Sequence, residues 1–431
     1  MTFRNPDIDK FFSNSSLIQK YLDVEVALAK VQADLGLIPA EAAKAIASNA
    51  LLSNIDMAMF EKDFDRVGFP IVGLIKQLGN CIPDGFAEYL HWGATTQDIM
   101  DTSLILVLEE VCQYLEKELD VLIELLQNLA EKHKSSLMVG RSQLQQATPI
   151  TFGYKVAGWL APIVRYKSRL HQIKSSVLQV QFGGAVGTLA SLGEIGFQVR
   201  EKLGIQLKLE SPNLTWHTQR DTLTEFMSFI AMVTTSLSKI AQDILFMTQS
   251  EVRELTEKGE GKSSTMPNKR NPVITQKVLV AGKMARSGLQ ALLESSIQDH
   301  ERGTATWQME WNLIPSITSH GFYALKTLNG LLKDSLEVNT EIMLENLSSI
   351  DTIYAEALMM ELAPYLGRQK AHDLVDVAIT KAQKKDNFKA LVLSDTKIIN
   401  TLSKSEIEAI FSGKIHVEMA KISTEKFLKS I

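Results

Sequence analysis

Residues 261–272, with the sequence GKSSTMPNKRNP, combine side chains that could bind an anionic molecule and react with it. Two adjacent serines, Ser263 and Ser264, are followed by Lys269 and Asn271, so that hydroxyl, ammonium and amide donors lie close together in the sequence. Such donors can hold a carboxylate and stabilise negative charge that develops during a reaction. The two prolines exclude a helix here, because proline lacks the backbone N–H that a helix interior needs. Composition alone favours a solvated loop between helices, and a substrate-binding loop is the alternative.

A second group of polar side chains, Thr95, Thr96 and Gln97, follows Gly93 at the point where a long helix is expected to begin. Backbone N–H groups at a helix N-terminus, together with hydroxyls, form a favourable site for an anion. Asp98 comes next, and an acidic residue in this position is expected to cap the helix. The stretch therefore predicts a second point at which an anion could bind.

Two histidines, His91 and His217, lie in polar stretches that also contain aromatic residues. An isolated histidine can act as a general acid or base near neutral pH, but it serves more often as a structural hydrogen-bond donor. The residues alone therefore favour a structural role for both histidines.

The composition is that of an ordinary globular protein, with 431 residues of which 45% are hydrophobic and 22% charged. This length allows more than one domain. The net charge of −5 gives no support for a nucleic-acid partner.

The two cysteines form no CxxC motif, which argues against a disulfide framework or a structural zinc site and favours a reducing compartment. No secretory-type segment and no uninterrupted apolar run of about 20 residues are visible, so we expect a cytoplasmic protein without a membrane partner.

Long amphipathic helices are the elements that must position these residues. Between Gly93 and Gly140 the chain has no Gly or Pro, and apolar residues recur every three or four positions, which is typical of an amphipathic helix. Between Pro212 and Gly259 the same steps alternate as they do in the a/d seam of a coiled coil. Other segments are less regular: apolar-rich helical stretches are expected at about 273–300 and 316–347, and short turns or hairpins at 137–140 and 180–187.

Helices of this length, at 1.5 Å per residue and up to about 50 Å long, predict an elongated bundle. We expect three domains: a helical N-terminal domain over 1–97, a central long-helix bundle over 98–340 and a small helical C-terminal domain over 341–431. The long apolar seams are expected to complete their burial against other subunits, which predicts a homo-oligomer.

The stretch SSTMPNKRNP (263–272) resembles the signature loop of the fumarase/aspartase superfamily, G-S-S-x-M-P-x-K-x-N-P, with Lys262 in place of the usual Gly. Four further stretches are similar to other conserved regions of that family: 91–102, 140–159, 215–221 and 300–311. The resemblance covers essentially the whole chain. It implies an all-α fold of three helical domains whose central bundle assembles into a homotetramer, with each site shared by three subunits.

The resemblance also implies roles for individual residues. Ser263 or Ser264 would be the acid/base on a mobile loop, and His217 is a further catalytic candidate. The remaining candidates would bind a small-molecule polycarboxylate substrate: His91, Thr95, Thr96, Gln97, Arg141, Gln146, Lys269, Asn271 and Arg302. Enzymes of this family handle a proton on a carbon next to a carboxylate, and the resemblance implies that neither a metal nor a redox cofactor takes part.

Two stretches indicate the branch of the family. In RSQLQQA (141–147) glutamines stand where adenylosuccinate lyases carry two histidines, and WHTQRD (216–221) also differs from the pattern of those enzymes. Both stretches look like the 3-carboxy-cis,cis-muconate cycloisomerase branch, although Gln143 and Asn268 depart from its pattern. We therefore expect a cofactor-independent cycloisomerase or lyase. The alternatives are adenylosuccinate lyase, another fumarate-releasing lyase, or a non-catalytic structural relative such as the lens crystallins of this superfamily.

Overall fold

The computed structural model describes residues 2–83, 85–259, 261–382 and 387–431. The fold is all-α, as the sequence predicts, with only short strands among the described residues. The N-terminal helices are α1 (Pro6–Phe11), α2 (Asn14–Asp34), α3 (Ala40–Asn49), α4 (Met57–Val67) and α5 (Pro70–Cys81). The middle of the chain forms α6 (Thr96–Lys132), α7 (Phe152–Val177), α8 (Ile195–Leu207), α9 (Asp221–Met247), α10 (Val273–Ser295) and α11 (Ala305–Gly330). The C-terminal helices are α12 (Thr340–Ser348), α13 (Ala355–Leu366), α14 (Arg368–Ala382), α15 (Phe388–Ser394), α16 (Thr396–Ile399), α17 (Lys404–Phe411) and α18 (Lys414–Leu428).

The chain divides into two compact units. Unit 1 comprises Met1–Leu119, Tyr166–Ser238 and Lys277–Lys326, and unit 2 comprises Asp120–Arg165, Lys239–Gln276 and Thr327–Ile431. The long helices α6, α7, α9, α10 and α11 contribute residues to both units. The division into three domains at 97 and 340 stays a prediction.

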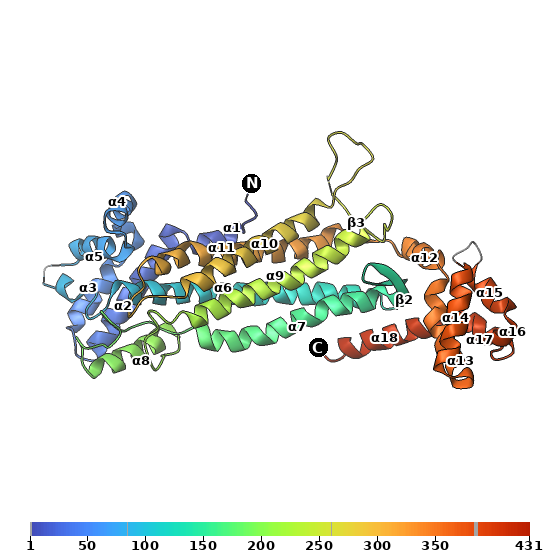
Figure 1. The fold of residues 1–431 in the computed structure, drawn as a ribbon. Helices are drawn as coiled ribbons and strands as arrows, with labels where there is room; N and C mark the ends of the chain where they lie inside the picture. The colour runs from blue at the N-terminus through green and yellow to red at the C-terminus, as the bar shows by residue number, and fades with distance from the viewer. Residues whose placement is uncertain (1, 84, 260, 383–386) are drawn as a thin grey trace. The chain divides into compact units, whose positions relative to one another are not determined.

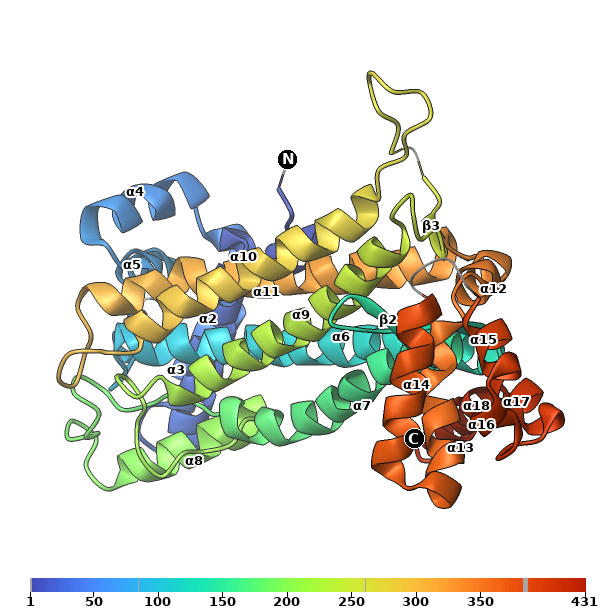
Figure 2. The same ribbon diagram turned by 45° about the vertical axis from the view of Figure 1, so that its right-hand side comes forward.

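In unit 1 the helices α6, α9, α10 and α11 run alongside one another (Figures 1 and 2). The packing is close: a Cβ added to Gly321 of α11 would lie 2.6 Å from the Cγ2 atom of Ile230 on α9. Arg286 of α10 donates hydrogen bonds to Thr234 and Ser238 of α9. The absence of a side chain at Gly321 thus allows α9 and α11 to approach, and the buried polar contacts fix the position of α10.

The apolar seam predicted for the second long helix is confirmed in α9. All eight of its residues are buried within the chain itself: Leu223, Phe226, Ile230, Val233, Leu237, Ile240, Ile244 and Met247. Among the helices of the described residues, α9 is the one with the length and apolar composition of a membrane span, a property that core helices also have. Because its seam is already covered within the chain, the seam alone does not require a second subunit.

Unit 2 contains two small antiparallel ladders and a separate helical core. Strands β1 (Leu137–Ser142) and β2 (Gln145–Thr151) form a hairpin, and β3 (Leu255–Glu257) pairs with β4 (Leu336–Val338). The helices α12 to α17 surround a buried apolar cluster that includes Leu358, Leu362, Val375, Phe388, Val392 and Ile407. Figure 2 shows this group of C-terminal helices in orange and red.

One local expectation needs correction. The helix expected over 316–347 ends at Gly330, because a π-helical turn (Leu331–Ser335) and strand β4 follow, and β4 pairs with β3 before α12 begins. The expectation of turns or small hairpins at the other two segments is confirmed: 137–140 is part of the β1–β2 hairpin, and 180–187 is an irregular glycine-rich segment with a turn at 185–186.

Candidate active site

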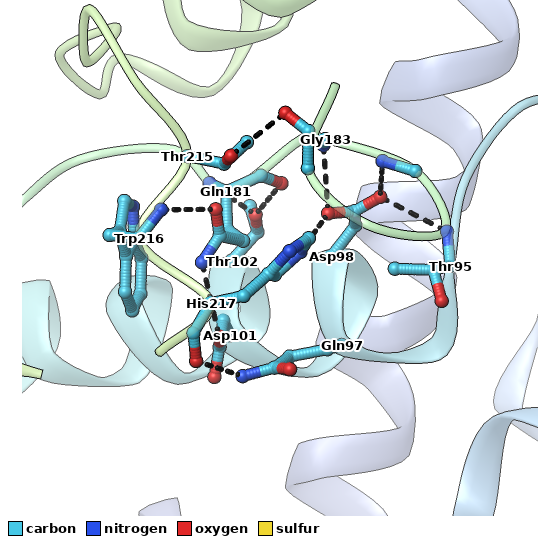
Figure 3. A network of polar contacts seen from close by, with 12 residues as sticks. Thr95, Gln97, Asp98, Asp101, Thr102, Gln181, Gly183, Thr215, Trp216 and His217 are labelled. Carbon is cyan, nitrogen blue, oxygen red and sulfur yellow. Dashed lines mark hydrogen bonds and ion pairs between the residues drawn. The ribbon is translucent and has the colours of Figure 1, made fainter. Parts of the chain in front are cut away.

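Asp98 is the centre of a polar network at the start of α6. Its carboxylate accepts hydrogen bonds from the backbone N–H groups of Thr95 at 3.0 Å, Gly183 at 2.9 Å and Gly184 at 2.9 Å. The fourth donor is the His217 ring, whose Nε2 atom lies 2.7 Å from Asp98 Oδ1 (Figure 3). The bond from Thr95 confirms the predicted helix cap. Asp98 also joins the start of α6 to the glycine-rich segment and to His217, which the sequence does not reveal.

The contact with Asp98 determines how His217 can act. An ionised carboxylate only accepts hydrogen bonds, so Nε2 carries the proton and Nδ1 presents a lone pair. Nδ1 has no hydrogen-bond partner among the described residues, and a Cβ added to Gly187 would lie 3.7 Å from it. Both side chains are buried. A histidine oriented by a carboxylate in this way can accept a proton at its free nitrogen.

Arg302 of unit 1 contacts this network through Gln97. Its guanidinium donates to Gln97 Oε1 at 2.7 Å and to the carbonyl of Ala185 at 2.7 Å. Burial lowers the pKa of Arg302, while Asp98 and Asp101 act in the opposite direction. A half-buried arginine with neutral hydrogen-bond acceptors is suited to pair with an anionic ligand.

The predicted substrate-binding residues at the start of α6 differ in how they are used. Gln97 is buried, and its amide donates to the His217 carbonyl at 2.8 Å and accepts from Arg302. The half-buried Thr95 and Thr96 have hydroxyls without a hydrogen-bond partner among the described residues. The two threonines can therefore reach a ligand, whereas Gln97 holds His217 and Arg302 in place.

His91 lies in the turn before α6 and is held from α2. Its Nδ1 atom lies 2.6 Å from Oε1 of Glu25, whose side chain is buried and whose Oε2 has no partner among the described residues. Gln32, seven residues further along α2, donates to the carbonyl of Trp92 at 2.7 Å. His91 has a positive φ of 59°, which is unfavourable for a non-glycine residue. Two buried polar residues on one helix thus fix a strained turn beside Thr95.

Neither Glu25 nor Gln32 is identified as a functional residue from the sequence. Both lie in a largely apolar helix at a spacing of seven residues, which places them on the same helical face. The signal that could have identified them is a polar residue at a position where the pattern of α2 predicts a buried apolar side chain.

The signature loop lies in unit 2, between β3 and α10, and extends away from its two ends (Figure 1). Two sets of hydrogen bonds fix the base of the loop. The Glu257 carboxylate accepts hydrogen bonds from the backbone of Ile274 and Thr275 at the start of α10. The N–H of Asn271 donates to the carbonyl of Gly261 at 2.7 Å, an approach so close that a Cβ on Gly261 would lie 2.0 Å from the Asn271 oxygen.

The two serines of the loop have different surroundings. The Ser263 hydroxyl accepts hydrogen bonds from the backbone N–H groups of Thr265 at 3.3 Å and Met266 at 3.0 Å. Ser264 is exposed, and its one hydrogen-bond contact among the described residues is the Thr265 hydroxyl, at 3.4 Å. Lys269 is exposed and its ammonium has no partner among the described residues. The tip of the loop therefore presents free hydroxyl and ammonium groups above a fixed base.

Arg141 and Gln146 face each other across the β1–β2 hairpin in unit 2. Arg141 makes a two-point ion pair with the fully buried Glu254, with N–O distances of 2.7 and 2.8 Å. Gln146 is exposed. Arg141 is thus committed to a protein carboxylate, while the Gln146 amide is available to a ligand.

The structure brings together Thr95, Gln97, His217 and Arg302 around Asp98 in unit 1, with His91 in the preceding turn. The other predicted residues, Arg141, Gln146, Ser263, Ser264, Lys269 and Asn271, belong to unit 2. Among the described residues, no three His, Cys, Asp or Glu side chains are grouped as protein ligands of a metal would be.

Comparisons with known proteins identify the class. Residues 1–285 match a family model described as lyase, and residues 351–427 match one described as adenylosuccinate lyase C-terminus. The chain is 37% identical to trans-aconitate decarboxylase 1 of Mycosarcoma maydis, over 95% of the chain and 84% of that protein. It is 36% identical to 3-carboxy-cis,cis-muconate cycloisomerase of Acinetobacter baylyi, over 96% of the chain and 94% of that protein.

A solved structure gives the same result. The crystal structure of 3-carboxy-cis,cis-muconate lactonizing enzyme from Pseudomonas putida matches with a TM-score of 0.92 and 34% identity, covering 99% of this chain and 97% of that one. The fold is thus that of a lyase-type helical enzyme. The chain belongs to the fumarase/aspartase superfamily and is an enzyme of that superfamily.

Proposed function

We propose that the chain is a cofactor-independent 3-carboxy-cis,cis-muconate cycloisomerase. Two of the similar proteins carry names that denote reactions of unsaturated tricarboxylates, 3-carboxy-cis,cis-muconate and trans-aconitate. The observation that carries the proposal is the turn of the β1–β2 hairpin, where Gln143 and Gln146 are exposed. An amide can bind a carboxylate but cannot supply the proton that the histidines of adenylosuccinate lyases would supply.

Carboxylates of the substrate are bound by two sets of donors. In unit 1 the hydroxyls of Thr95 and Thr96 and the Arg302 guanidinium bind one carboxylate, with Gln97 holding Arg302 in place. In unit 2 the ammonium of Lys269 and the amide of Asn271 bind the carboxylate next to the reacting carbon. His91 and Gln146 contribute further polar contacts. Arg141 acts indirectly, because its ion pair with Glu254 holds the hairpin that carries Gln146.

In the lactonizing direction an oxygen of one substrate carboxylate forms a C–O bond to a carbon of the double bond. The π electrons move toward the neighbouring carbon and its carboxylate, producing an aci-carboxylate dianion that the cationic side chains binding the substrate stabilise. A protonated group of the enzyme then delivers a proton to that neighbouring carbon, and the lactone results. In the reverse direction the same group removes the proton.

Ser263 is the acid/base of this step. Alone, a serine hydroxyl is a weak base, and it becomes effective only where its alkoxide is stabilised. The backbone N–H groups of Thr265 and Met266 already donate to the Ser263 oxygen, so two donors are in place to stabilise the alkoxide. Lys269 adds a positive charge on the same loop. Ser264 has no such donors among the described residues and binds substrate instead.

His217 is the second catalytic group. With Asp98 holding Nε2–H, the free Nδ1 atom can accept or donate a proton near the glycine-rich segment 183–187. The Asp98 carboxylate stabilises the imidazolium that would form. This pair serves proton transfer to or from a carboxylate-bearing part of the substrate.

A polycarboxylate decarboxylase is a second candidate, which the 37% identity to trans-aconitate decarboxylase 1 favours. Release of fumarate from adenylosuccinate or a related adduct is a third, and the match to the adenylosuccinate lyase C-terminus keeps it open. For each candidate reaction we propose a cytoplasmic homotetramer in which three subunits contribute residues to each active site.

Purified protein should be tested side by side with 3-carboxy-cis,cis-muconate, trans-aconitate and adenylosuccinate. Loss of the muconate diene absorbance in the ultraviolet is the expected result. Release of carbon dioxide from trans-aconitate without loss of muconate would replace the proposal by the decarboxylase. Turnover of adenylosuccinate alone would show that a group other than a histidine at 143 or 146 supplies the acid.

A further inference from the structure

Unit 1 contains a partly open cavity of about 370 Å³ that the proposed active site does not use. Residues of α2, α4, α6 and α11 contribute to its walls. Six aromatic side chains line it: Phe12, Tyr21, Phe60, Phe64, Trp307 and Trp311. The volume falls in the range of small-molecule sites, about 300–1,000 Å³, and exceeds the ~150 Å³ that holds a benzene molecule. An apolar ring that displaces water from these aromatic side chains gains the free energy of apolar burial.

One polar group in the aromatic wall has no hydrogen-bond partner among the described residues. Tyr21, which is 6% exposed, lines the cavity, and its hydroxyl contacts no acceptor there. Burial, together with the charge of Asp101, raises the pKa of Tyr21, so the hydroxyl stays protonated and can donate. Largely buried donors without partners are uncommon in native proteins, and this hydroxyl is available to an acceptor.

The charged residues of the wall indicate which molecules the cavity rejects. Asp101, Glu310 and Glu61 line it, and none of the described lining residues is Lys, Arg or His. Asp101 and Glu310 are both paired with the buried Arg220, at 2.8 and 2.5 Å, so their carboxylates need no cation from a ligand. An anion in this cavity would meet carboxylates and no positive charge within the wall. A polycarboxylate substrate therefore has no place here.

From these observations we infer that the cavity is a second binding site, which takes an uncharged aromatic molecule bearing a hydrogen-bond acceptor such as a carbonyl. The ring packs against the aromatic wall, and the acceptor receives a hydrogen bond from the Tyr21 hydroxyl. The described lining of the cavity includes none of Thr95, Asp98, His217 and Arg302, so the site is separate from the carboxylate site. Asp101, which lines the cavity, is connected to the network around Asp98 through Gln181, at 3.3 Å.

Isothermal titration calorimetry with three probes of similar size tests the inference: acetophenone, ethylbenzene and benzoate. Acetophenone has a ring and a carbonyl, ethylbenzene has the ring without an acceptor, and benzoate has the ring with a negative charge. We expect acetophenone to bind more tightly than ethylbenzene, by about five-fold for each hydrogen bond gained. Benzoate should not bind in the cavity.

Matched variants locate the probe. Tyr21→Phe keeps the aromatic wall and should weaken acetophenone binding about five-fold, without changing the affinity for ethylbenzene. Tyr154→Phe removes a hydroxyl from an exposed tyrosine of α7 and is the control without effect. Leu104→Trp, which fills the cavity from α6, should abolish binding of both probes.

Three results would overturn the inference. Saturable binding of neither acetophenone nor ethylbenzene would show that the cavity admits no aromatic molecule. Benzoate binding as tight as that of acetophenone would contradict the charge argument. Acetophenone binding that survives unchanged in Tyr21→Phe would place the probe elsewhere. None of these measurements depends on the identity of the catalysed reaction.

Discussion

At the scale of residues, the two adjacent serines of the signature loop differ in their hydrogen bonds. Ser263 accepts from two backbone N–H groups, whereas Ser264 is exposed. We expect Ser263→Ala to lower kcat by about 10²–10⁴-fold, the usual contribution of a general acid or base. Ser264→Ala should lower kcat/KM by only about five-fold, the contribution of one hydrogen bond. Steady-state kinetics with 3-carboxy-cis,cis-muconate measure both values.

The control for the serines is Ser263→Cys, which restores an ionisable group at the same position and should recover part of the lost activity. Circular dichroism of each variant should match that of the parent protein, because the loop lies outside the helical cores. The opposite ranking, with Ser264→Ala the more damaging change, would assign the acid/base role to Ser264.

The Glu25–His91 pair gives a prediction that depends on pH. Burial disfavours the imidazolium, but the charge and hydrogen bond of Glu25, aided by Asp98, outweigh burial and raise the pKa of His91. The pair therefore stabilises the fold fully below the ordinary histidine pKa of about 6.5, and this contribution is lost as pH rises through the raised pKa. In Glu25→Gln the charge is removed while burial remains, so the pKa of His91 should fall below its ordinary value.

A titration of the His91 ring protons followed by NMR measures this change directly. Glu41→Gln removes an exposed carboxylate of α3 in the same unit and should leave the His91 titration unaltered. If His91 titrates at the same pH in Glu25→Gln and in the parent protein, then Glu25 does not control its charge.

The sequence predicts these residues unevenly. Ser263, Lys269 and Asn271 are proposed from the sequence because the loop that carries them resembles a family signature, whereas its composition alone favours a solvated loop. Glu25 and the contacts of Asp98 with four donors cannot be found in this way. His91, the partner of Glu25, lies 66 residues away along the chain, and His217, the most distant partner of Asp98, lies 119 residues away. Such contacts exist only after the helices have packed, and a single sequence does not show which polar residues of a helix will face one another.

At the scale of elements, the turn of the β1–β2 hairpin stores backbone strain. Gln143 and Leu144 have positive φ angles of 49° and 63°, although neither is glycine. Two-residue hairpin turns with both central residues in this region usually contain Asn and Gly. The strain is retained in a region that carries the proposed ligand Gln146, and strained turns are concentrated at functional sites.

The strained turn predicts a stabilising substitution. Leu144→Gly should raise the free energy of unfolding by about 0.5–1 kcal/mol. Glycine adopts the left-handed conformation without the steric cost that leucine has, and this gain exceeds the cost of the larger backbone entropy that glycine loses on folding. The midpoint of urea denaturation measures the change. Leu51→Gly is the control: Leu51 is also exposed but has an ordinary φ of −115°, so this change should destabilise the protein. A lower midpoint for Leu144→Gly would mean that the Leu144 side chain itself is bound in the assembled protein.

Elements with long periodic patterns are well predicted, and short ones are not. The seam of α9 can be read from the sequence because every step of three or four residues is filled by an apolar side chain. Strand β4 cannot be read from the sequence, because it has only three residues and is stabilised by pairing with β3, about 80 residues earlier along the chain. The helix predicted over 316–347 runs through β4 for this reason.

At the scale of the whole molecule, the apolar surface supports the predicted assembly. Large apolar side chains remain exposed on the long helices although the seams are buried, among them Met232 and Phe246 of α9 and Val280 and Met284 of α10. Val280 and Met284 are four residues apart and lie on one face of α10. Exposed apolar residues gathered on the helices of a bundle are typical of a surface that another subunit covers.

The last prediction concerns the division of the proposed site between subunits. The Asp98–His217 pair lies in unit 1 and Ser263 in unit 2, and the family resemblance implies that three subunits complete each site. If His217 and Ser263 of one site come from different chains, two inactive variants should complement each other. A mixture of His217→Ala and Ser263→Ala chains, dissociated and reassembled together, should recover about one quarter of the parent activity, because random mixing gives each site both intact residues in about one case in four. Each variant reassembled alone is the control, and light scattering should give the mass of four chains. If both residues came from the same chain, no hybrid would contain an intact site and the mixture would stay inactive.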